Sequence, residues 1–240
     1  MDGLRAHFLS WAGPPAGGIP LVLVHGLGVS SRYLVRLAGI LAAGRPVFAP
    51  DIPGFGRSAK PRRTLDVPGQ ADFLASWMAA AGLERGAFLG HSLGSQGVAD
   101  LACRRPELVE RLVLAAPTID DAGRTVPGEV LRLLLDVPRE PFSLIPVVVA
   151  DYLRAGPVRI FRTLRHALAD RIEEKLPAIG MPALVMRGER DPVVSGPWTE
   201  KVRRLLPRGR LAVIPRAGHA LQFGFPRETA AVVEAFLAGE

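Results

Sequence analysis

The stretch AFLGHSLGSQGVADLA, residues 87–102, places an apolar run before Gly-His-Ser-Leu-Gly and a helix-forming run after it. A tight turn from a strand into a helix leaves its central residue strained and exposed above the edge of a sheet. Ser92 occupies that position between Gly90 and Gly94, where larger side chains would collide with neighbouring elements. The motif also occurs by chance in glycine-rich chains, but its strand–turn–helix context predicts that Ser92 is a nucleophile.

Five further apolar runs are expected to form strands together with residues 86–92: they are residues 19–26, 45–54, 110–117, 181–188 and 209–218. Continuous apolar strands are typical of a parallel sheet that is buried on both faces. Between the strands, apolar residues recur at helical spacing in residues 31–43, 69–82, 94–104, 196–206 and 226–238. This alternation predicts an α/β fold with a mostly parallel central sheet and helices on both faces. Residues 4–13 alternate in polarity and are expected to form an edge hairpin.

Residues 118–180 break this alternation because they contain no convincing strand. Proline-separated helical patterns lie near residues 127–136, 143–155 and 157–171. We expect a helical cap over residues 118–180 and a core made of residues 1–117 and 181–240, although ordinary crossover helices are the alternative. A mobile lid at this place would exclude water and shape a pocket. The residues predicted to line that pocket are Phe142, Leu144 and Ile145.

A nucleophilic serine needs a base, and the base needs an acid that orients it. Of the five histidines, His219 lies in a loop directly after the last expected strand. Asp191 follows the strand before it, and the carboxyl ends of parallel strands share one edge of the sheet. The order Ser92, Asp191, His219 therefore predicts a catalytic triad. Asp120 and Asp121 follow the fourth strand at the same edge and compete for the role of the acid.

The segment VHGLGVSSRY, residues 24–33, also follows a strand at that edge. Gly26 and Gly28 would let the backbone bend closely past the serine, so that the Leu27 N–H points inward. Together with the Leu93 N–H it would form an oxyanion hole with two donors. A plain glycine-rich turn is the alternative reading. The chain lacks the glycine motifs of phosphate and dinucleotide binding, and its His and Cys residues have no metal-ligand spacing.

The pieces HGLG, DIPGFGRS, GHSLGS, RGERDPVV and AGHA, in this order, resemble the α/β-hydrolase fold family, in its serine hydrolase branch with a helical cap. The resemblance implies that Ser92 is the nucleophile, His219 the general base and Asp191 its orienting acid. It implies that Leu27 and Leu93 donate to the oxyanion. Because the phosphate, dinucleotide and metal motifs are missing, we expect no cofactor. His25 and the loop of residues 51–58 would be structural supports.

Departures from the family pattern narrow the expected reaction. Ser92, where some branches carry Asp, argues against dehalogenase and epoxide hydrolase chemistry. Ala220 follows the histidine, where relatives that cleave carbon–carbon bonds often carry Trp. We therefore expect a carboxylesterase that cleaves an ester, or a thioester, of a small to medium acyl group. A carbon–carbon or thioester hydrolase of a degradative or biosynthetic pathway and a ligand-binding receptor of the same fold are the alternatives.

The composition bounds the possible partners. The chain has 48% hydrophobic and 22% charged residues and a net charge of +7, but no basic run interleaved with aromatic residues, so we expect no nucleic-acid partner. No signal peptide is visible, and the most apolar run, residues 144–150, is too short to span a membrane. A single cysteine, Cys103, is compatible with a reducing compartment. We expect a cytoplasmic protein with a small-molecule ester or thioester as its partner and no membrane partner; the oligomeric state is not indicated.

Overall fold

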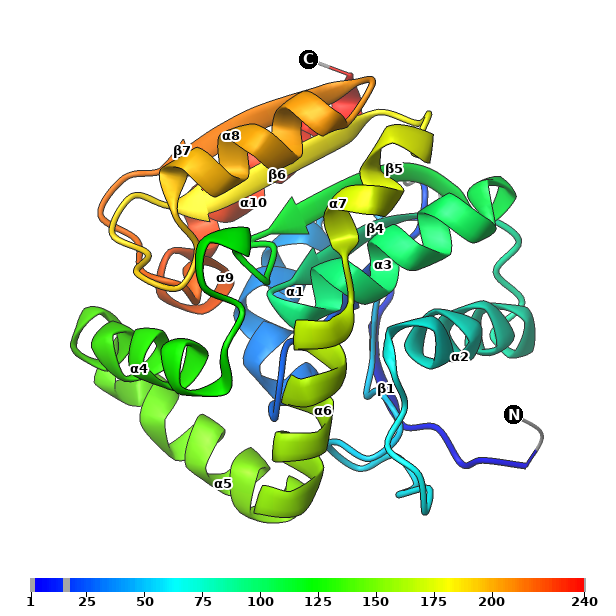
Figure 1. Cartoon of the computed structure of the whole chain (residues 1–240). Coiled ribbons are helices and arrows are strands. Elements are labelled where there is room, and N and C mark those ends of the chain that lie inside the picture. Colours follow the sequence, from blue (N-terminus) through cyan, green and yellow to red (C-terminus); the bar gives the residue numbers. More distant parts are fainter. Residues whose placement is uncertain (1–2, 15–17, 240) are drawn as a thin grey trace.

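The computed structural model describes residues 3–14 and 18–239, and its centre is one seven-stranded sheet in the order β1-β3-β2-β4-β5-β6-β7 (Figure 1). The strands are Phe8–Trp11 (β1), Leu21–Val24 (β2), Val47–Pro50 (β3), Gly86–His91 (β4), Val109–Ala115 (β5), Ala183–Gly188 (β6) and Gly209–Ile214 (β7). Every neighbouring pair is parallel except β1 with β3. The α/β prediction is thereby confirmed. The expected edge hairpin is wrong, because β1 pairs with β3 and the chain runs through β2 in between.

The helices cover both faces of the sheet (Figure 1). They are Val35–Leu41 (α1), Val67–Ala80 (α2), Leu93–Arg104 (α3), Val126–Asp136 (α4), Ile145–Ala155 (α5), Pro157–Ala169 (α6), Ile172–Lys175 (α7), Gly196–Leu205 (α8), Leu221–Gly224 (α9) and Pro226–Ala238 (α10). Short 3-10 turns include Ser31–Leu34 (η1), Val137–Arg139 (η4) and Phe142–Leu144 (η5). Helices α1 and α10 pack together on one face, and α2, α3 and α8 lie on the other. Among the helices described, none is both long and apolar enough to cross a membrane.

Helices α4 to α7 separate β5 from β6, and α4, α5 and α6 lie together beyond the sheet (Figure 1). Polar contacts join them to the start of η1 and to α3. The buried Asp151 of α5 accepts hydrogen bonds from Ser30 Oγ at 2.6 Å and from Arg32 Nη1 at 3.4 Å. Gln96 of α3 donates its Nε2–H to the carbonyl oxygen of Ala167 in α6 at 2.9 Å. The division into a core and a cap stays a prediction.

Candidate functional site

The turn between β4 and α3 holds Ser92 in a backbone conformation that residues with side chains rarely adopt, with φ 55° and ψ −122°. The flanking glycines make this turn possible. A Cβ atom on Gly90 would lie 2.4 Å from the carbonyl oxygen of Gly94, and one on Gly94 would lie 2.5 Å from that of Val24. The backbone therefore packs too closely for larger residues at either position, and Ser92 is left at the amino end of α3.

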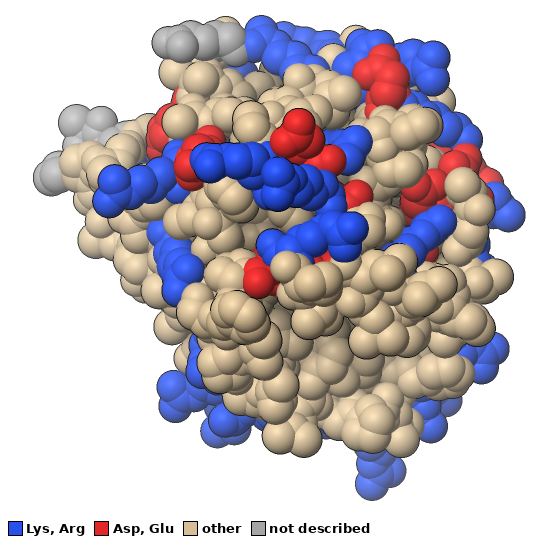
Figure 2. Space-filling view, turned by 90° about the vertical axis from the view of Figure 1, so that its left-hand side faces the viewer, with Lys and Arg blue, Asp and Glu red and all other residues tan. Residues whose placement is uncertain are grey.

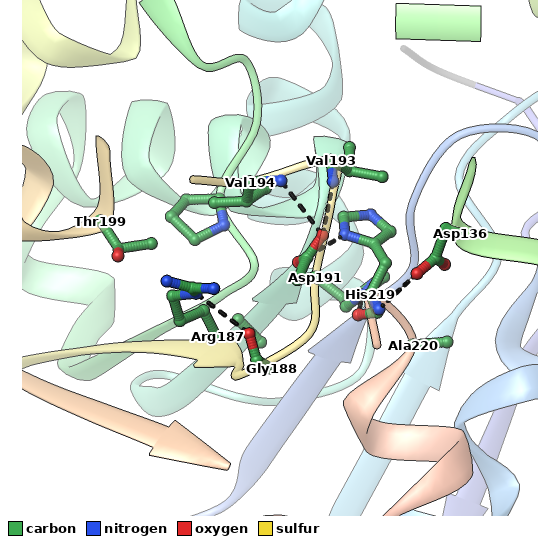
Figure 3. A network of polar contacts seen from close by, with 12 residues as sticks. Asp136, Arg187, Gly188, Asp191, Val193, Val194, Thr199, His219 and Ala220 are labelled. Carbon is green, nitrogen blue, oxygen red and sulfur yellow. Dashed lines mark hydrogen bonds and ion pairs between the residues drawn. The ribbon is translucent and has the colours of Figure 1, made fainter. Parts of the chain in front are cut away.

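His219 and Asp191 meet although 28 positions separate them in the chain (Figure 3). Nδ1 of His219 lies 2.9 Å from Oδ2 of Asp191, and both side chains are buried. The other carboxylate oxygen of Asp191 accepts the backbone N–H groups of Val193 at 2.7 Å and Val194 at 3.1 Å. Because the carboxylate can only accept, Nδ1 of His219 carries a proton and Nε2 is the basic atom of the neutral ring.

The two competing acids lie elsewhere. Asp120 accepts the backbone N–H of Ala122 at 3.0 Å and that of Ser195 at 3.2 Å, so its carboxylate supports a loop. Asp121 forms an ion pair with Lys201. Of the three aspartates considered, only Asp191 contacts the ring of His219 among the contacts of the described residues.

The electrostatics of the pair favour an ionised Asp191 next to a protonated His219. Burial alone would raise the pKa of Asp191, but the charge of His219 and the backbone donors outweigh it and hold the pKa below its usual value. Burial alone would lower the pKa of His219, but the carboxylate of Asp191 and two further acids raise it to about 9. Nε2 of His219 is buried and has no hydrogen-bond partner within residues 3–14 and 18–239.

The loop after β2 brings Leu27 to the same cavity as Ser92, Leu93 and His219. Leu93 is the first residue of α3, so its N–H has no acceptor within the helix. Gly28 has φ 78°, and a Cβ atom there would lie 2.4 Å from the ring of Tyr152. The loop thus turns sharply at the point where the second oxyanion donor was expected.

His25 and Asp51 hold this loop in place. His25 donates Nδ1–H to the carbonyl oxygen of Gly26 at 2.9 Å and accepts the N–H of Ile52 at Nε2 at 3.0 Å. The buried carboxylate of Asp51 accepts the N–H of Ser31 at 2.7 Å and that of Arg57 at 2.9 Å. Oδ2 of Asp51 also lies 2.8 Å from Nδ1 of His7, so both residues link the segments around this loop.

A model of the alpha/beta hydrolase family matches residues 21–232, which contain all of these elements. The chain belongs to the alpha/beta hydrolase family. Lipase 3 of Moraxella sp. is 26% identical over 252 residues, covering 92% of this chain and 78% of that protein. The (lyso)-N-acylphosphatidylethanolamine lipase of Mus musculus is 31% identical over 147 residues, covering 60% of this chain and only 41% of that protein. The solved structure of a bacterial membrane phospholipase A is 28% identical, with a TM-score of 0.87 over 99% of this chain and 84% of that one.

This alpha/beta hydrolase contains a hydrogen-bonded chain that the sequence did not predict. The Gly26 N–H donates to the hydroxyl of Tyr33 at 3.2 Å, and that hydroxyl contacts Nδ1 of His91. Nε2 of His91 lies 2.9 Å from the carbonyl oxygen of His219. Burial, reinforced by the charge of His219, lowers the pKa of His91 to about 3, so its ring is neutral. The carbonyl can only accept, so Nε2–H donates to it and Nδ1 accepts from Tyr33.

A pair of acids from the segment after β5 also reaches the His219 loop of this hydrolase. Asp136 accepts the N–H of His219 at 3.1 Å (Figure 3), and Glu140 accepts the N–H of Ala220 at 2.7 Å. A Cβ atom on Gly218 would lie 2.5 Å from Oε1 of Glu140, so only glycine leaves room for this contact. Burial, together with the neighbouring Asp136, raises the pKa of Glu140 to about 7. The sequence carried no signal for this pair, because helix spacing does not reveal contacts across 80 or more positions.

The cavity above Ser92 in this hydrolase has a volume of about 470 Å³. Leu144 and Ile145 line it together with aliphatic residues of α4 and α6. The prediction that Phe142 lines it is wrong, because its side chain is 88% exposed and lies outside the lining. Leu144, two positions later, turns inward and is buried, which leaves Phe142 on the outer side of η5.

Proposed function

We propose that this hydrolase cleaves carboxylic esters through a covalent acyl-enzyme, with Ser92 as nucleophile, His219 as general base and Asp191 as orienting acid. One observation carries the proposal. The ring of His219 has its Nδ1 on a buried carboxylate and its Nε2 without a partner among the described residues, at the cavity that also contains Ser92. A ring oriented in this way can take the proton of a serine hydroxyl that comes within hydrogen-bond reach of Nε2. Among the described residues no hydrogen bond joins Nε2 to Oγ of Ser92, so this contact forms when the substrate is bound.

The steps follow from this arrangement. Nε2 of His219 accepts the proton of Ser92 as its Oγ attacks the ester carbonyl, and Asp191 stabilises the imidazolium that forms. The N–H groups of Leu27 and Leu93 donate to the oxyanion of the tetrahedral intermediate. The imidazolium then gives its proton to the leaving alcohol, and the acyl group remains on Ser92. Water attacks the acyl-enzyme with His219 again as base, which releases the acid and restores the serine.

The substrate class is supported by the cavity and by the relatives. An aliphatic lining around a volume of about 470 Å³ suits an acyl chain of small to medium length. Lipase 3 and the phospholipase A are named for cleaving lipid esters, which favours an ester over a carbon–carbon bond. A thioester would fit the same chemistry, and a receptor of this fold would bind its ligand without turnover.

The test combines covalent labelling with turnover. A fluorophosphonate probe is expected to label the wild-type protein and not Ser92→Ala, with circular dichroism as the control for folding. Hydrolysis of p-nitrophenyl esters is expected to fall by about 10⁶ in Ser92→Ala. Acyl thioesters and ring-fission analogues are compared in the same panel. Labelling without turnover of any substrate would favour the receptor, and labelling retained in Ser92→Ala would exclude Ser92 as the nucleophile.

A further inference from the structure

The outer surface of helices α4, α5 and α6 is unusually apolar. Of the fifteen large hydrophobic residues that are exposed in the described part of the chain, eleven lie between Val130 and Phe161. We define the cap face by the six of them that carry the argument: Leu131, Leu134, Leu135, Phe142, Leu153 and Phe161. Phe142 is 88% and Leu153 is 79% exposed. Exposed apolar side chains gathered on neighbouring helices mark a candidate binding surface.

On the same helices the exposed charged side chains are basic, whereas the acidic side chains are buried or half-buried. Within residues 122–169 the exposed charged side chains are all arginines: Arg139, Arg154, Arg162 and Arg165. The acids of this segment are turned inward: Glu129, Asp136 and Asp151 are buried, and Glu140 is half-buried. The lower half of Figure 2 shows a broad surface without charged groups, bordered by blue side chains. On α6, Phe161 stands between Val158 and Arg165 at helical spacing, so apolar and basic residues share one face.

The cap face also borders the entrance to the cavity above Ser92, because Leu134 belongs to both. Five side chains are at once exposed and part of the cavity lining: Val130, Leu134, Val137, Ile145 and Val149. They come from α4 with η4 and from α5, so the cavity opens to the outside between these helices. A ligand that left an apolar phase at the cap face would therefore enter the cavity without first crossing bulk water.

We propose that the cap face docks on the surface of a bilayer that contains anionic lipids. The apolar side chains would enter the boundary between headgroups and acyl chains, and the arginines would contact lipid phosphates. A second copy of this chain fits less well, because a symmetric contact would bring two arginine-rimmed faces together without exposed acids to neutralise them. The proposal goes beyond the proposed function, since docking requires no hydrolysis. It replaces our sequence-based expectation of no membrane partner, which rested on the lack of a spanning run, since surface docking needs none.

The apolar part is tested by co-sedimentation of the full-length chain with vesicles of phosphatidylcholine mixed with phosphatidylglycerol. All variants carry Ser92→Ala, so that the lipids stay intact and a failure of the proposed esterase function cannot affect the readout. The double variant Phe142→Ser, Leu153→Ser is expected to lower the partition coefficient by about tenfold or more, since each side chain loses its burial in lipid. The matched control Ile40→Ser, Val213→Ser removes two exposed hydrophobic residues outside residues 118–180 and is expected to leave binding unchanged.

The basic part is tested with the same vesicles. The triple variant Arg154→Gln, Arg162→Gln, Arg165→Gln is expected to lose about fivefold in partitioning for each arginine removed. It should lose little on phosphatidylcholine alone. The control Arg105→Gln, Arg204→Gln, Arg208→Gln lowers the net charge equally at exposed positions of the other part of the chain. Equal losses of vesicle partitioning in both triple variants would show that only the net charge matters, and would overturn the proposal that the cap face docks on the bilayer.

Light scattering without lipid distinguishes the alternative occupant. A chain that stays monomeric in buffer and partitions to anionic vesicles through the cap face supports the proposal. A chain that forms a dimer, which Phe142→Ser, Leu153→Ser dissociates, and that does not co-sediment with vesicles would overturn it in favour of self-association. Absence of both dimer and vesicle binding in the Ser92→Ala background would also overturn it.

Discussion

His91 donates its Nε2–H to the carbonyl oxygen of His219 at 2.9 Å. The residue before the proposed nucleophile thus supports the backbone of the proposed base. Through Tyr33 the same ring is connected to the N–H of Gly26, next to the expected oxyanion donor. The neutral imidazole of His91 and the phenol of Tyr33 therefore connect the loop after β2, the turn after β4 and the His219 loop. Neither is expected to touch the substrate carbonyl, so both are positioning residues.

Tyr33→Phe is expected to destabilise the protein by about 1–3 kcal/mol, because it leaves a buried N–H and a buried imidazole nitrogen without a partner. Denaturant unfolding measures this change. The kcat for ester hydrolysis should also fall, although His91 and His219 are unchanged, because the segments that carry them are held less firmly. Tyr152→Phe is the matched control, since no hydrogen bond of its hydroxyl is found among the described residues. Equal stability of the two variants would contradict the proposed role of the Tyr33 hydroxyl.

Asp191→Asn is expected to lower kcat by about 10⁴, because an amide in place of the carboxylate favours the wrong tautomer of His219. Asp120→Asn is the control. Its carboxylate accepts two backbone N–H groups away from His219, so this change should affect stability more than turnover. Ester hydrolysis and thermal unfolding of both variants are the measurements. A severe loss in Asp120→Asn combined with near wild-type turnover in Asp191→Asn would place the acid on the strand before.

The pH profile should reveal the acids near His219. His219 must be neutral to act as a base, and its pKa is about 9, so kcat/KM should rise with pH toward that value. Glu140, with a pKa of about 7, is already ionised where His219 titrates. Glu140→Gln removes a negative charge that stabilises the imidazolium, so the pKa of His219 should fall.

The acidic limb of the kcat/KM profile should then move to lower pH by several tenths of a unit, which raises activity at neutral pH by about two- to fivefold. Glu228→Gln, on α10, is the control and should leave the profile in place. A shift of the limb to higher pH in Glu140→Gln would refute this electrostatic role.

Ile145→Ala is expected to shift the preference toward longer acyl chains by opening the cavity, with each added methylene that is buried gaining about 0.8 kcal/mol. Phe142→Ala should leave the chain-length profile of soluble p-nitrophenyl esters unchanged, because its side chain lies outside the cavity. Labelling by a small fluorophosphonate should be equal in both variants. An altered profile in Phe142→Ala alone would mean that η5 folds inward during turnover.

The sheet and its order of chemistry-bearing loops could be predicted because the inner strands contain short apolar runs and parallel strands end at one edge. That reasoning placed Ser92, Asp191 and His219 near one another. It failed for Phe142 because α5 and η5 are apolar on more than one side, so spacing does not tell which side faces the cavity. It also missed Tyr33 and Glu140, whose hydrogen bonds depend on how distant segments pack and not on any local pattern.

The buried carboxylate of Asp151 has a consequence for how the chain melts. It accepts hydrogen bonds from Ser30 and Arg32, while Lys175, the last residue of α7, pairs with Asp100 of α3 at 2.8 Å. Detaching the helices between β5 and β6 would break these contacts and expose the apolar lining of the cavity to water, so those helices and the sheet should unfold together. Calorimetry should record one heat-absorption peak with equal calorimetric and van't Hoff enthalpies. Asp151→Ala should split this peak or broaden it, because the helical segment then gains a melting temperature of its own.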